Sequence, residues 1–335
     1  MFRRFLAAAL VLAVAGALLV TVWPQLFGVQ RNAFVAQVVS LRGLGTVAGL
    51  LLVVVLVTLA MLSRFARRLS FSLAMLLLAF AGMNVAVLAT RGFGSAEPIP
   101  AGPGITVLSW NTLGAATSAE AVANLALEAK ANVVALPETS QASAEQIASL
   151  MAAAGQPMAV HTTAFDQIAA ARSTSLLIGA DLGEYSITDG PSTSVLPSVV
   201  AEPDSGDGPT IIAVHAVSPT GGEMANWRSD LSWLAAACGG DNVIMAGDFN
   251  ATIDHMARLG STPESTLGNC SDAATTARSA AVGTWPTFLP AVLGAPIDHV
   301  MATAQWRVSG AQVVEDRDHV GSDHRPIVVK LRRDG

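Results

Sequence analysis

Three long apolar runs without a charged residue dominate the first 91 residues of the chain. They cover about residues 6–22, 44–62 and 71–89. Each is close in length to the ~20 residues that a helix needs to cross a bilayer. The whole chain is 52% hydrophobic with a mean hydropathy of +0.50, which is too apolar for an ordinary soluble protein. We therefore expect three transmembrane helices within residues 1–91.

The first run also fits a cleaved signal peptide. Arg3 and Arg4 precede an alanine-rich stretch, and the segment Ala13-Val14-Ala15 resembles a cleavage site. The other two runs would hold the protein in the membrane under either interpretation.

The placement of arginines predicts how these helices are oriented. Two precede the first helix (positions 3 and 4), three lie between the second and the third (positions 64, 67 and 68), and only Arg31 and Arg42 lie between the first and the second. Basic residues favour the cytoplasmic side. We expect a multi-pass protein of the cell membrane with a cytoplasmic N-terminus, and an odd number of crossings then places everything after residue 89 outside the cytoplasm.

Residues 92–104 (GFGSAEPIPAGPG) have the glycine and proline content of a linker. The expected organisation is a membrane anchor at 1–91, a linker at 92–104 and a folded domain at 105–335. The anchor holds eight of the 19 basic residues and no acid, which leaves 11 basic and all 25 acidic residues, a formal net charge of −14, for the remainder. An acidic domain is poorly suited to binding a nucleic-acid backbone.

Strand-like and helix-like segments are mixed beyond the linker, which predicts an α/β or α+β domain with a central sheet. The expected strands lie at 105–109, 133–136, 174–178, 211–217, 243–246, 308–314 and 327–331, and the expected helices at 118–131, 143–154 and 223–237. Cys238 and Cys270 flank the strand at 243–246. Outside the cytoplasm a disulfide is the favoured state of such a pair, and two free buried thiols are the alternative.

Five short acidic and amide clusters are spread along this domain, and most of them follow a strand-like run. They are Trp110-Asn111, Leu136-Pro137-Glu138, Gly247-Asp248-Phe249-Asn250, Ile297-Asp298-His299 and Ser322-Asp323-His324-Arg325-Pro326. A polar side chain at the end of a buried strand is aimed by rigid backbone, so several strand ends can converge on one point. Oxygen-rich clusters suit Mg²⁺, Mn²⁺ or Ca²⁺, which indicates phosphoester rather than peptide chemistry.

The ordered set of these clusters, with a strand that carries His215 between the second and the third, resembles the endonuclease/exonuclease/phosphatase superfamily. The resemblance covers about residues 105–331 and excludes the N-terminal helices. It implies a two-layered β-sandwich flanked by helices, here preceded by three transmembrane helices, and a metal-dependent hydrolase that acts on phosphate ester bonds.

The resemblance implies a metal shell made of Glu138, Asn111 and Asp323, with Glu138 as the principal ligand and Asn111 hydrogen-bonded beside it. The expected ion is Mg²⁺, with Mn²⁺ as the alternative. Several nucleases of the superfamily carry an acidic residue two positions after the motif asparagine, where this chain has Leu113. That departure favours a site for a single metal ion.

The resemblance also implies five catalytic residues. Asp248 would orient and deprotonate the attacking water, and Asn250 would bind a phosphate oxygen. His324 would stabilise the charge that develops on the phosphate, while Asp298 holds its imidazole in the useful tautomer. His215 would touch a non-bridging oxygen.

Each cluster taken alone also fits an ordinary turn, but unrelated turns have no reason to occur together in this order. His161, His255, His299 and His319 match no role and are expected to be structural or exposed. Trp285 fits packing at the rim of the site better than stacking on a substrate. These residues are set aside as parts of the scaffold.

The substrate expected from charge and anchoring is a lipid-linked or small phosphoester, because the bilayer concentrates lipid headgroups near the domain. The candidate partners are therefore the membrane, through the N-terminal helices, and a phosphoester in a lipid headgroup, a small molecule or a nucleic acid. An extracellular or periplasmic nuclease is the first alternative. A non-catalytic, membrane-tethered binding module is the alternative from another class, and the near-complete set of clusters argues against it.

Overall fold

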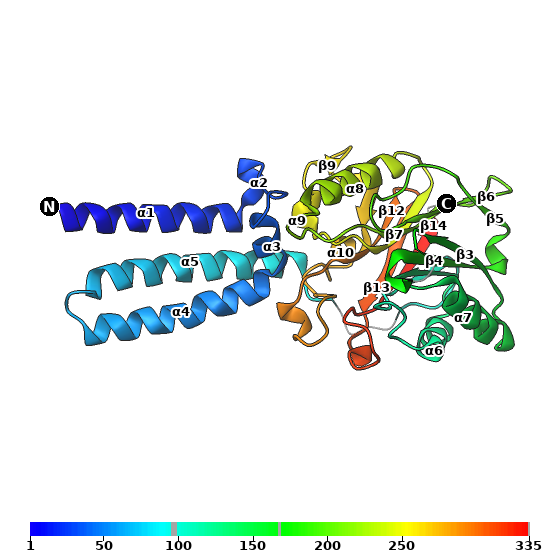
Figure 1. Ribbon diagram of the computed structural model, residues 1–335, viewed down its shortest axis with the longest axis horizontal. Helices are drawn as coiled ribbons and strands as arrows, with labels where there is room; N and C mark the ends of the chain where they lie inside the picture. The colour runs from blue at the N-terminus through cyan, green and yellow to red at the C-terminus, as the bar shows by residue number, and fades with distance from the viewer. Residues whose placement is uncertain (95–98, 167–168, 334–335) are drawn as a thin grey trace.

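The structure is a computed structural model that describes residues 1–94, 99–166 and 169–333. Three long helices form a rod, and a folded domain lies at one end of it (Figure 1). Residues 95–98 of the expected linker are outside the described residues, and so are the last two residues of the expected catalytic domain.

The rod consists of α1 (Phe2–Val22), α4 (Arg42–Leu62) and α5 (Arg67–Arg91), each long and apolar enough to cross a membrane. Helices α4 and α5 pack where Gly45 and Gly49 face the ring of Phe80, and a Cβ at Gly49 would lie 3.4 Å from that ring. Small residues at this spacing let helix backbones approach each other. At most 28% of the most apolar stretch of any of these helices is buried, so their outer faces suit lipid.

Two short helices connect α1 to α4 at the end of the rod that meets the domain. They are α2 (Pro24–Phe27) and α3 (Val35–Ser40). This end of the rod also contains Arg42, where α4 begins, and Arg91, where α5 ends.

The domain contains two β-sheets. The first has the order β13 (Trp306–Val313), β14 (Ile327–Arg333), β1 (Ile105–Ser109), β2 (Val133–Pro137), β4 (Ser173–Gly179) and β3 (Met158–Ala164). The second has the order β5 (Tyr185–Ile187), β6 (Val199–Pro203), β7 (Thr210–His215), β8 (Val243–Asp248), β12 (Asp298–Thr303), β11 (Cys270–Asp272), β10 (Leu267–Gly268) and β9 (Leu259–Gly260).

The two sheets pack face to face, and helices cover their outer faces (Figure 1). Apolar side chains of both sheets, such as Val107 and Leu176 from one and Ile211 and Ile244 from the other, form the core between them. A second core lies under α8 (Met224–Ala237), and a third under α6 (Ala119–Ala129) and α7 (Gln141–Ala153). This is the expected β-sandwich flanked by helices and preceded by three candidate membrane helices.

The expected elements are present with modest shifts at their ends. The side chain of Ser118 accepts a hydrogen bond from the backbone N of Ala121 and caps α6, as its position before the helix suggests. Cys238 and Cys270 form a disulfide that ties the end of α8 to β11. Strands β3, β5, β6 and β9–β12 have no counterpart among the expected elements, because they are short, half-polar or rich in small residues.

A buried carboxylate joins the rod to the domain. Asp254 lies in α9 (Ile253–Met256), and its oxygens lie 2.9 Å from Arg42 Nε, 2.7 Å from Arg91 Nη2 and 2.6 Å from Gln25 Nε2. Burial alone would raise the pKa of Asp254, but the positive charges of Arg91 and Arg42 outweigh it and hold that pKa below its usual range. The carboxylate is therefore charged and paired where the two parts meet.

Backbone contacts add to this junction. The carbonyl of Ala36 in α3 lies 3.0 Å from Nε2 of His255, and the backbone N of Gly94 donates to the carbonyl of Arg278 at 2.8 Å. The first turn of α4 approaches η3 (Ala291–Leu293) so closely that a Cβ at Gly43 would overlap the carbonyl oxygen of Val292. Helices α3, α4 and α5 thus all contact the domain.

Candidate active site

Three side chains of the second sheet lie side by side because of strand register. His215 and Asp248 end the parallel strands β7 and β8 and are paired in register, and Asp298 begins β12 and pairs with Asp248 across the antiparallel ladder. The end of one strand and the start of its antiparallel neighbour meet at the same edge of a sheet. The register alone therefore brings these residues to one place.

The first sheet brings its polar residues to the facing edge in the same way. Asn111 follows β1 and Glu138 follows β2, which is parallel to β1. His324 precedes β14, which is antiparallel to β1. The indole Nε1 of Trp110 donates to the carbonyl of His324 at 2.9 Å and holds these segments together.

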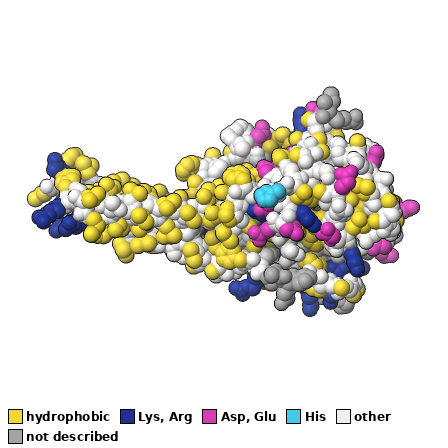
Figure 2. Space-filling model, turned by 90° about the horizontal axis from the view of Figure 1, so that it is seen from below, with side chains coloured by type: hydrophobic (Ala, Val, Ile, Leu, Met, Phe, Trp, Pro, Cys, Tyr) yellow, Lys and Arg dark blue, Asp and Glu magenta, His cyan; other side chains and the backbone are white. Residues whose placement is uncertain are grey.

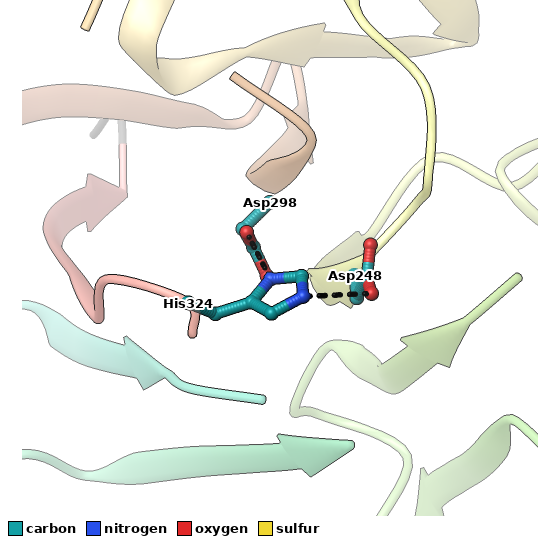
Figure 3. A group of neighbouring side chains, drawn as sticks. All are labelled: Asp248, Asp298 and His324. Carbon is teal, nitrogen blue, oxygen red and sulfur yellow. Dashed lines mark hydrogen bonds and ion pairs between the residues drawn. The ribbon is translucent and has the colours of Figure 1, made fainter. Parts of the chain in front are cut away.

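His324 lies between two carboxylates (Figure 3). Its Nδ1 is 2.9 Å from Oδ2 of Asp298, and its Nε2 is 3.8 Å from Oδ2 of Asp248. Burial would lower the pKa of His324, but the negative charges of Asp298 and Asp248 raise it to about 10. The imidazole is therefore positively charged at neutral pH, with Nε2 directed toward the site.

Asp248 is held by amide groups around its carboxylate. Its Oδ2 accepts from Nδ2 of Asn111 at 3.1 Å and from Nδ2 of Asn250 at 3.1 Å, and its Oδ1 accepts from the backbone N of Asn250 at 2.8 Å. Burial raises the pKa of Asp248 to about 7, although the charge of His324 opposes the rise. A carboxylate with a pKa near neutrality suits a general base.

Glu138 faces Asp248 across Asn111, whose Nδ2 also donates to Oε1 of Glu138 at 3.2 Å. The backbone of Glu138 is left-handed, with φ of 57°, and Thr112 fixes it by donating to its carbonyl at 3.0 Å. The side chain is half-buried, and burial raises its pKa. Asn111 thus presents its amide NH₂ to both carboxylates, while its Oδ1 accepts from the backbone N of Leu113.

Asp323 completes the rim next to these groups. Its Oδ2 accepts from Nε1 of Trp285 at 2.9 Å, and its Oδ1 lies 3.9 Å from Nε2 of His324. Oδ1 is buried and has no hydrogen-bond partner among the described residues. A buried carboxylate oxygen without a donor is an incomplete arrangement that a cation or a protonated ligand would complete.

The acidic groups fit a hard divalent cation. Ligand atoms of Asp248, Asp298 and His324 lie within 4.8 Å of one another, but the charged imidazole has no free lone pair to offer a metal ion. Glu138 and Asp323 offer carboxylate oxygens without that obstacle, and they lie near enough for the negative charge of Asp323 to contribute to the raised pKa of Glu138. They are the better candidate ligands.

His215 lies beside Asp248 on the neighbouring strand, and like Asp248 it is buried. Its Nδ1 is 3.3 Å from Oγ1 of Thr174, and burial together with the charge of His324 lowers its pKa to about 3. The imidazole is therefore neutral. It can donate or accept one hydrogen bond without adding charge to the site.

Arg325 supports the site, although the sequence assigned it no role. Arg325 is buried and donates to the carbonyls of Gly283 and Leu289, which shapes the loop that carries Trp285. That tryptophan is half-buried at the rim, and the SDHRP motif already contained the arginine that organises its loop. The position of Arg325 within this motif was the signal in the sequence that could have identified its role.

The histidines that were set aside include two buried structural ones. Nδ1 of His299 lies 2.7 Å from Oδ2 of Asp272, and its Nε2 lies 2.8 Å from the carbonyl of Ala251. Burial lowers the pKa of His299, but the charge of Asp272 raises it above its usual value. Nδ1 of His255 accepts from the backbone N of Thr252 at 2.9 Å. Both imidazoles support the segment that follows Asn250.

Comparison with known proteins gives one family. The model of the endonuclease/exonuclease/phosphatase family matches residues 108–324. No curated protein is significantly similar to the chain in sequence.

Solved structures with a similar fold include TDP2 from D. rerio. A form humanised by 14 mutations is 18% identical with a TM-score of 0.53, and the match covers 68% of this chain and 98% of that one. The complex of D. rerio TDP2 with a single-strand DNA product is 17% identical with a TM-score of 0.52, over 69% and 100% of the two chains. An endonuclease/exonuclease/phosphatase from Bacteroides vulgatus is 15% identical with a TM-score of 0.49, over 70% and 100%. At these identities the likeness with TDP2 concerns the fold.

Proposed function

The chain belongs to the endonuclease/exonuclease/phosphatase family, and from that membership we propose that it is a membrane-anchored, Mg²⁺-dependent phosphoesterase with its catalytic domain outside the cytoplasm. The observation that carries the proposal is the meeting of Asn111, Glu138, Asp248 and His324 from four separate segments at one edge of the sandwich. The reaction is hydrolysis of a phosphodiester or phosphomonoester by water that attacks phosphorus in line with the leaving oxygen.

Asp248 is the proposed general base. Its carboxylate is fixed by Asn111 and Asn250, and its raised pKa lets it accept a proton from water near neutral pH. Asn250 would also bind a phosphate oxygen, although its Nδ2 already donates to the carbonyl of Ala216 at 2.9 Å. Removing the proton as the water attacks keeps positive charge from building on the nucleophile.

His324 is the proposed electrophilic group. The charged imidazole directs Nε2 toward the site, where it would stabilise negative charge on the phosphate oxygens in the transition state. Asp298 accepts from Nδ1 and thereby fixes both the ring orientation and the charge. His215, which is neutral, would donate a hydrogen bond to a non-bridging oxygen.

Glu138 and Asp323 would hold the Mg²⁺ ion, or Mn²⁺ in its place, and Asn111 would complete this shell by orienting Glu138. When bound, a divalent ion neutralises the charge that develops on the phosphate oxygens. The exposed Leu113 offers no further carboxylate on this side, which supports a site for one ion.

Two observations support an extracytoplasmic domain. Arginines 3, 4, 64, 67 and 68 gather at the end of the rod away from the domain, where Lys and Arg side chains are visible in Figure 2. Basic residues favour the cytoplasmic side of a membrane. The Cys238–Cys270 disulfide is typical of proteins outside the cytoplasm.

A nuclease is the second candidate, and the fold it shares with TDP2 in complex with a single-strand DNA product favours it. The formal net charge of −14 beyond the anchor counts against it, because a polyanion is repelled at long range. A lipid-linked or small phosphoester needs attraction only at the site itself.

Assays on the full-length protein in lipid nanodiscs test these proposals. Hydrolysis would be measured in the presence of Mg²⁺, Mn²⁺ or EDTA. The substrates would be bis(4-nitrophenyl) phosphate, sugar phosphates, phospholipids and single-stranded DNA. We expect hydrolysis that depends on the divalent ion and is lost in Asp248→Asn. Hydrolysis of DNA alone would favour the nuclease, and no hydrolysis of any substrate would favour a binding module.

A further inference from the structure

The loop at residues 284–295 connects the membrane helices to the active site. At one end, η3 lies against the first turn of α4, where Gly43 leaves room for the carbonyl of Val292. At the other end, Trp285 donates to Oδ2 of Asp323, and the backbone N of Thr287 donates to the carbonyl of Asp323 at 3.0 Å. One short loop therefore spans from the end of a candidate membrane helix to the rim of the active site.

This loop has a fixed position relative to the rod. Arg325 donates to the carbonyl of Leu289 at 2.7 Å, and the paired Asp254 docks α9 against Arg42 and Arg91. The contact of Val292 with the first turn of α4 and the ion pairs of Asp254 thus hold the domain at two separate places on the same end of the rod. The loop at the rim of the site therefore lies next to the end of the rod that carries Arg42 and Arg91.

Exposed apolar side chains lie on this loop and on the two neighbouring loops of the rim. Phe288 is 80% exposed, Val292 50%, Leu113 41% and Val320 36%. We call these four residues the rim surface. Leu113 lies two residues after Asn111, and Val320 lies three residues before Asp323, so both belong to segments that supply the active site. Exposed large apolar groups that gather around a polar site indicate an interaction surface.

The loop that carries Phe288 and Val292 reaches the helical rod, because η3 lies against the first turn of α4. Figure 2 shows hydrophobic side chains extending from the helical rod onto the domain, up to a group of acidic side chains and a histidine. The same end of the rod carries exposed aromatic residues, with Trp23 at 60%, Phe27 at 48% and Phe34 at 75%. Aromatic side chains at the ends of membrane helices lie at the level of the lipid headgroups.

We propose that the rim surface rests in the headgroup region of the bilayer that holds the helices, so that the active site takes phosphoesters of membrane lipids directly from that leaflet. This inference rests on the proposed function and names its substrate class. Phe288 and Val292 enter the apolar boundary of the leaflet, while Asp323 and the groups behind it face the headgroup phosphates. The acidic domain is compatible with this arrangement, because the membrane helices rather than surface charge hold the enzyme at its substrate.

Depth-dependent quenching tests the position of the rim without any use of activity. Because the two native cysteines form a disulfide, Phe288→Cys introduces a single thiol that can carry a bimane fluorophore. The labelled full-length protein is placed in nanodiscs of phosphatidylcholine and phosphatidylglycerol with nitroxide-labelled lipid. Ile187→Cys, in β5 at the far end of the domain, is the matched control with an exposed side chain of 39%.

We expect strong quenching of bimane at position 288 and little at position 187. Equal, weak quenching at both positions would overturn the proposal, whatever the enzyme hydrolyses. Strong quenching at position 288 without hydrolysis of any phosphoester would leave the membrane contact standing and reject the proposed function.

A ratio of activities tests whether the contact delivers substrate. Rates on phosphatidylglycerol in the nanodisc and on soluble bis(4-nitrophenyl) phosphate are compared within each variant. A charge at an interfacial position is costly, so Phe288→Asp should lower the lipid-to-soluble ratio by about tenfold, and Ile187→Asp should leave the ratio unchanged. A ratio that Phe288→Asp does not alter would contradict delivery from the leaflet.

Discussion

Nδ1 of His324 lies 2.9 Å from Oδ2 of Asp298, and both side chains are buried. The pair governs the charge of this imidazole, because burial alone would lower the pKa of His324, whereas the negative charges of Asp298 and Asp248 raise it to about 10. The proposed mechanism needs His324 protonated and Asp248 ionised. Activity should therefore rise as Asp248 loses its proton and fall as His324 loses its own.

Asp298→Asn should move the alkaline limb of the pH profile to lower pH. Without the negative charge of Asp298, the effect of burial on the pKa of His324 is offset less. That pKa should therefore fall, by about 1 unit or more for the loss of a close charge partner. The pH dependence of kcat/KM on a soluble phosphodiester measures the shift. Asp316→Asn, at an exposed carboxylate, is the control. An alkaline limb at the same pH in Asp298→Asn would show that Asp298 does not govern the imidazole.

Asp248→Asn should reduce turnover by about 10³-fold, because removal of a general base costs roughly 10²–10⁴ in rate. The amide keeps the size of the side chain and can still contact Asn111, so the fold should persist. Single-turnover rates and circular dichroism would be measured together, with Asp241→Asn on the surface as the control. Turnover close to that of the unmodified protein would remove Asp248 from the mechanism.

Glu138→Gln should mainly raise the Mg²⁺ concentration needed for half-maximal activity. The substitution removes a charged ligand oxygen but keeps an oxygen and the hydrogen-bonding shape next to Asn111. Activity is titrated against Mg²⁺ in the variant and in Glu145→Gln, where the carboxylate is exposed on α7. An equal Mg²⁺ concentration for half-maximal activity in both variants would show that Glu138 does not bind the ion.

The sequence alone predicted the elements whose patterns are strong. The three apolar runs, the capped helix α6 and the buried strands β1, β2, β4 and β8 have uninterrupted signals of the kind that local patterns resolve. Asp298 shows the limit. It begins a strand instead of ending one, and it reaches Asp248 only because β12 runs antiparallel to β8. Strand direction depends on distant segments, and a local pattern does not contain it.

Local sequence patterns could not predict the junction between the rod and the domain either. Asp254 reads as an ordinary surface residue of a short helix, and Arg42 reads as one of two arginines in a loop. Each becomes buried only because the other supplies the opposite charge across more than 200 residues of sequence. His255 of the same segment is buried next to the carbonyl of Ala36, which lies 3.0 Å from its Nε2 and is also distant in sequence.

A reporter fused after Gly335 tests the orientation. Because basic residues favour the cytoplasmic side, alkaline phosphatase, which needs disulfides, should be active at this position, and a reporter active only in the cytoplasm should not. The same reporters fused after Arg64, between α4 and α5, are the control and should give the opposite result. A cytoplasmic reporter active after Gly335 would reverse the topology and place the rim surface at the inner leaflet.

Asp254→Asn should destabilise the full-length protein, and the loss should depend on pH. The substitution leaves Arg42 and Arg91 without their carboxylate, which for a buried pair costs about 3–5 kcal/mol. The folded-state pKa of Asp254 lies below the unfolded value of 3.8, so its contribution to stability is present above that pH and is lost as the pH falls below it. Melting temperatures in nanodiscs should therefore differ between the unmodified protein and Asp254→Asn at pH 7, and the difference should shrink progressively as the pH falls below 3.8 toward the lower folded-state pKa. Asp207→Asn, at an exposed carboxylate, should match the unmodified protein throughout, and a difference for Asp254→Asn that stays constant with pH would show that its carboxylate charge does not hold the domain on the rod.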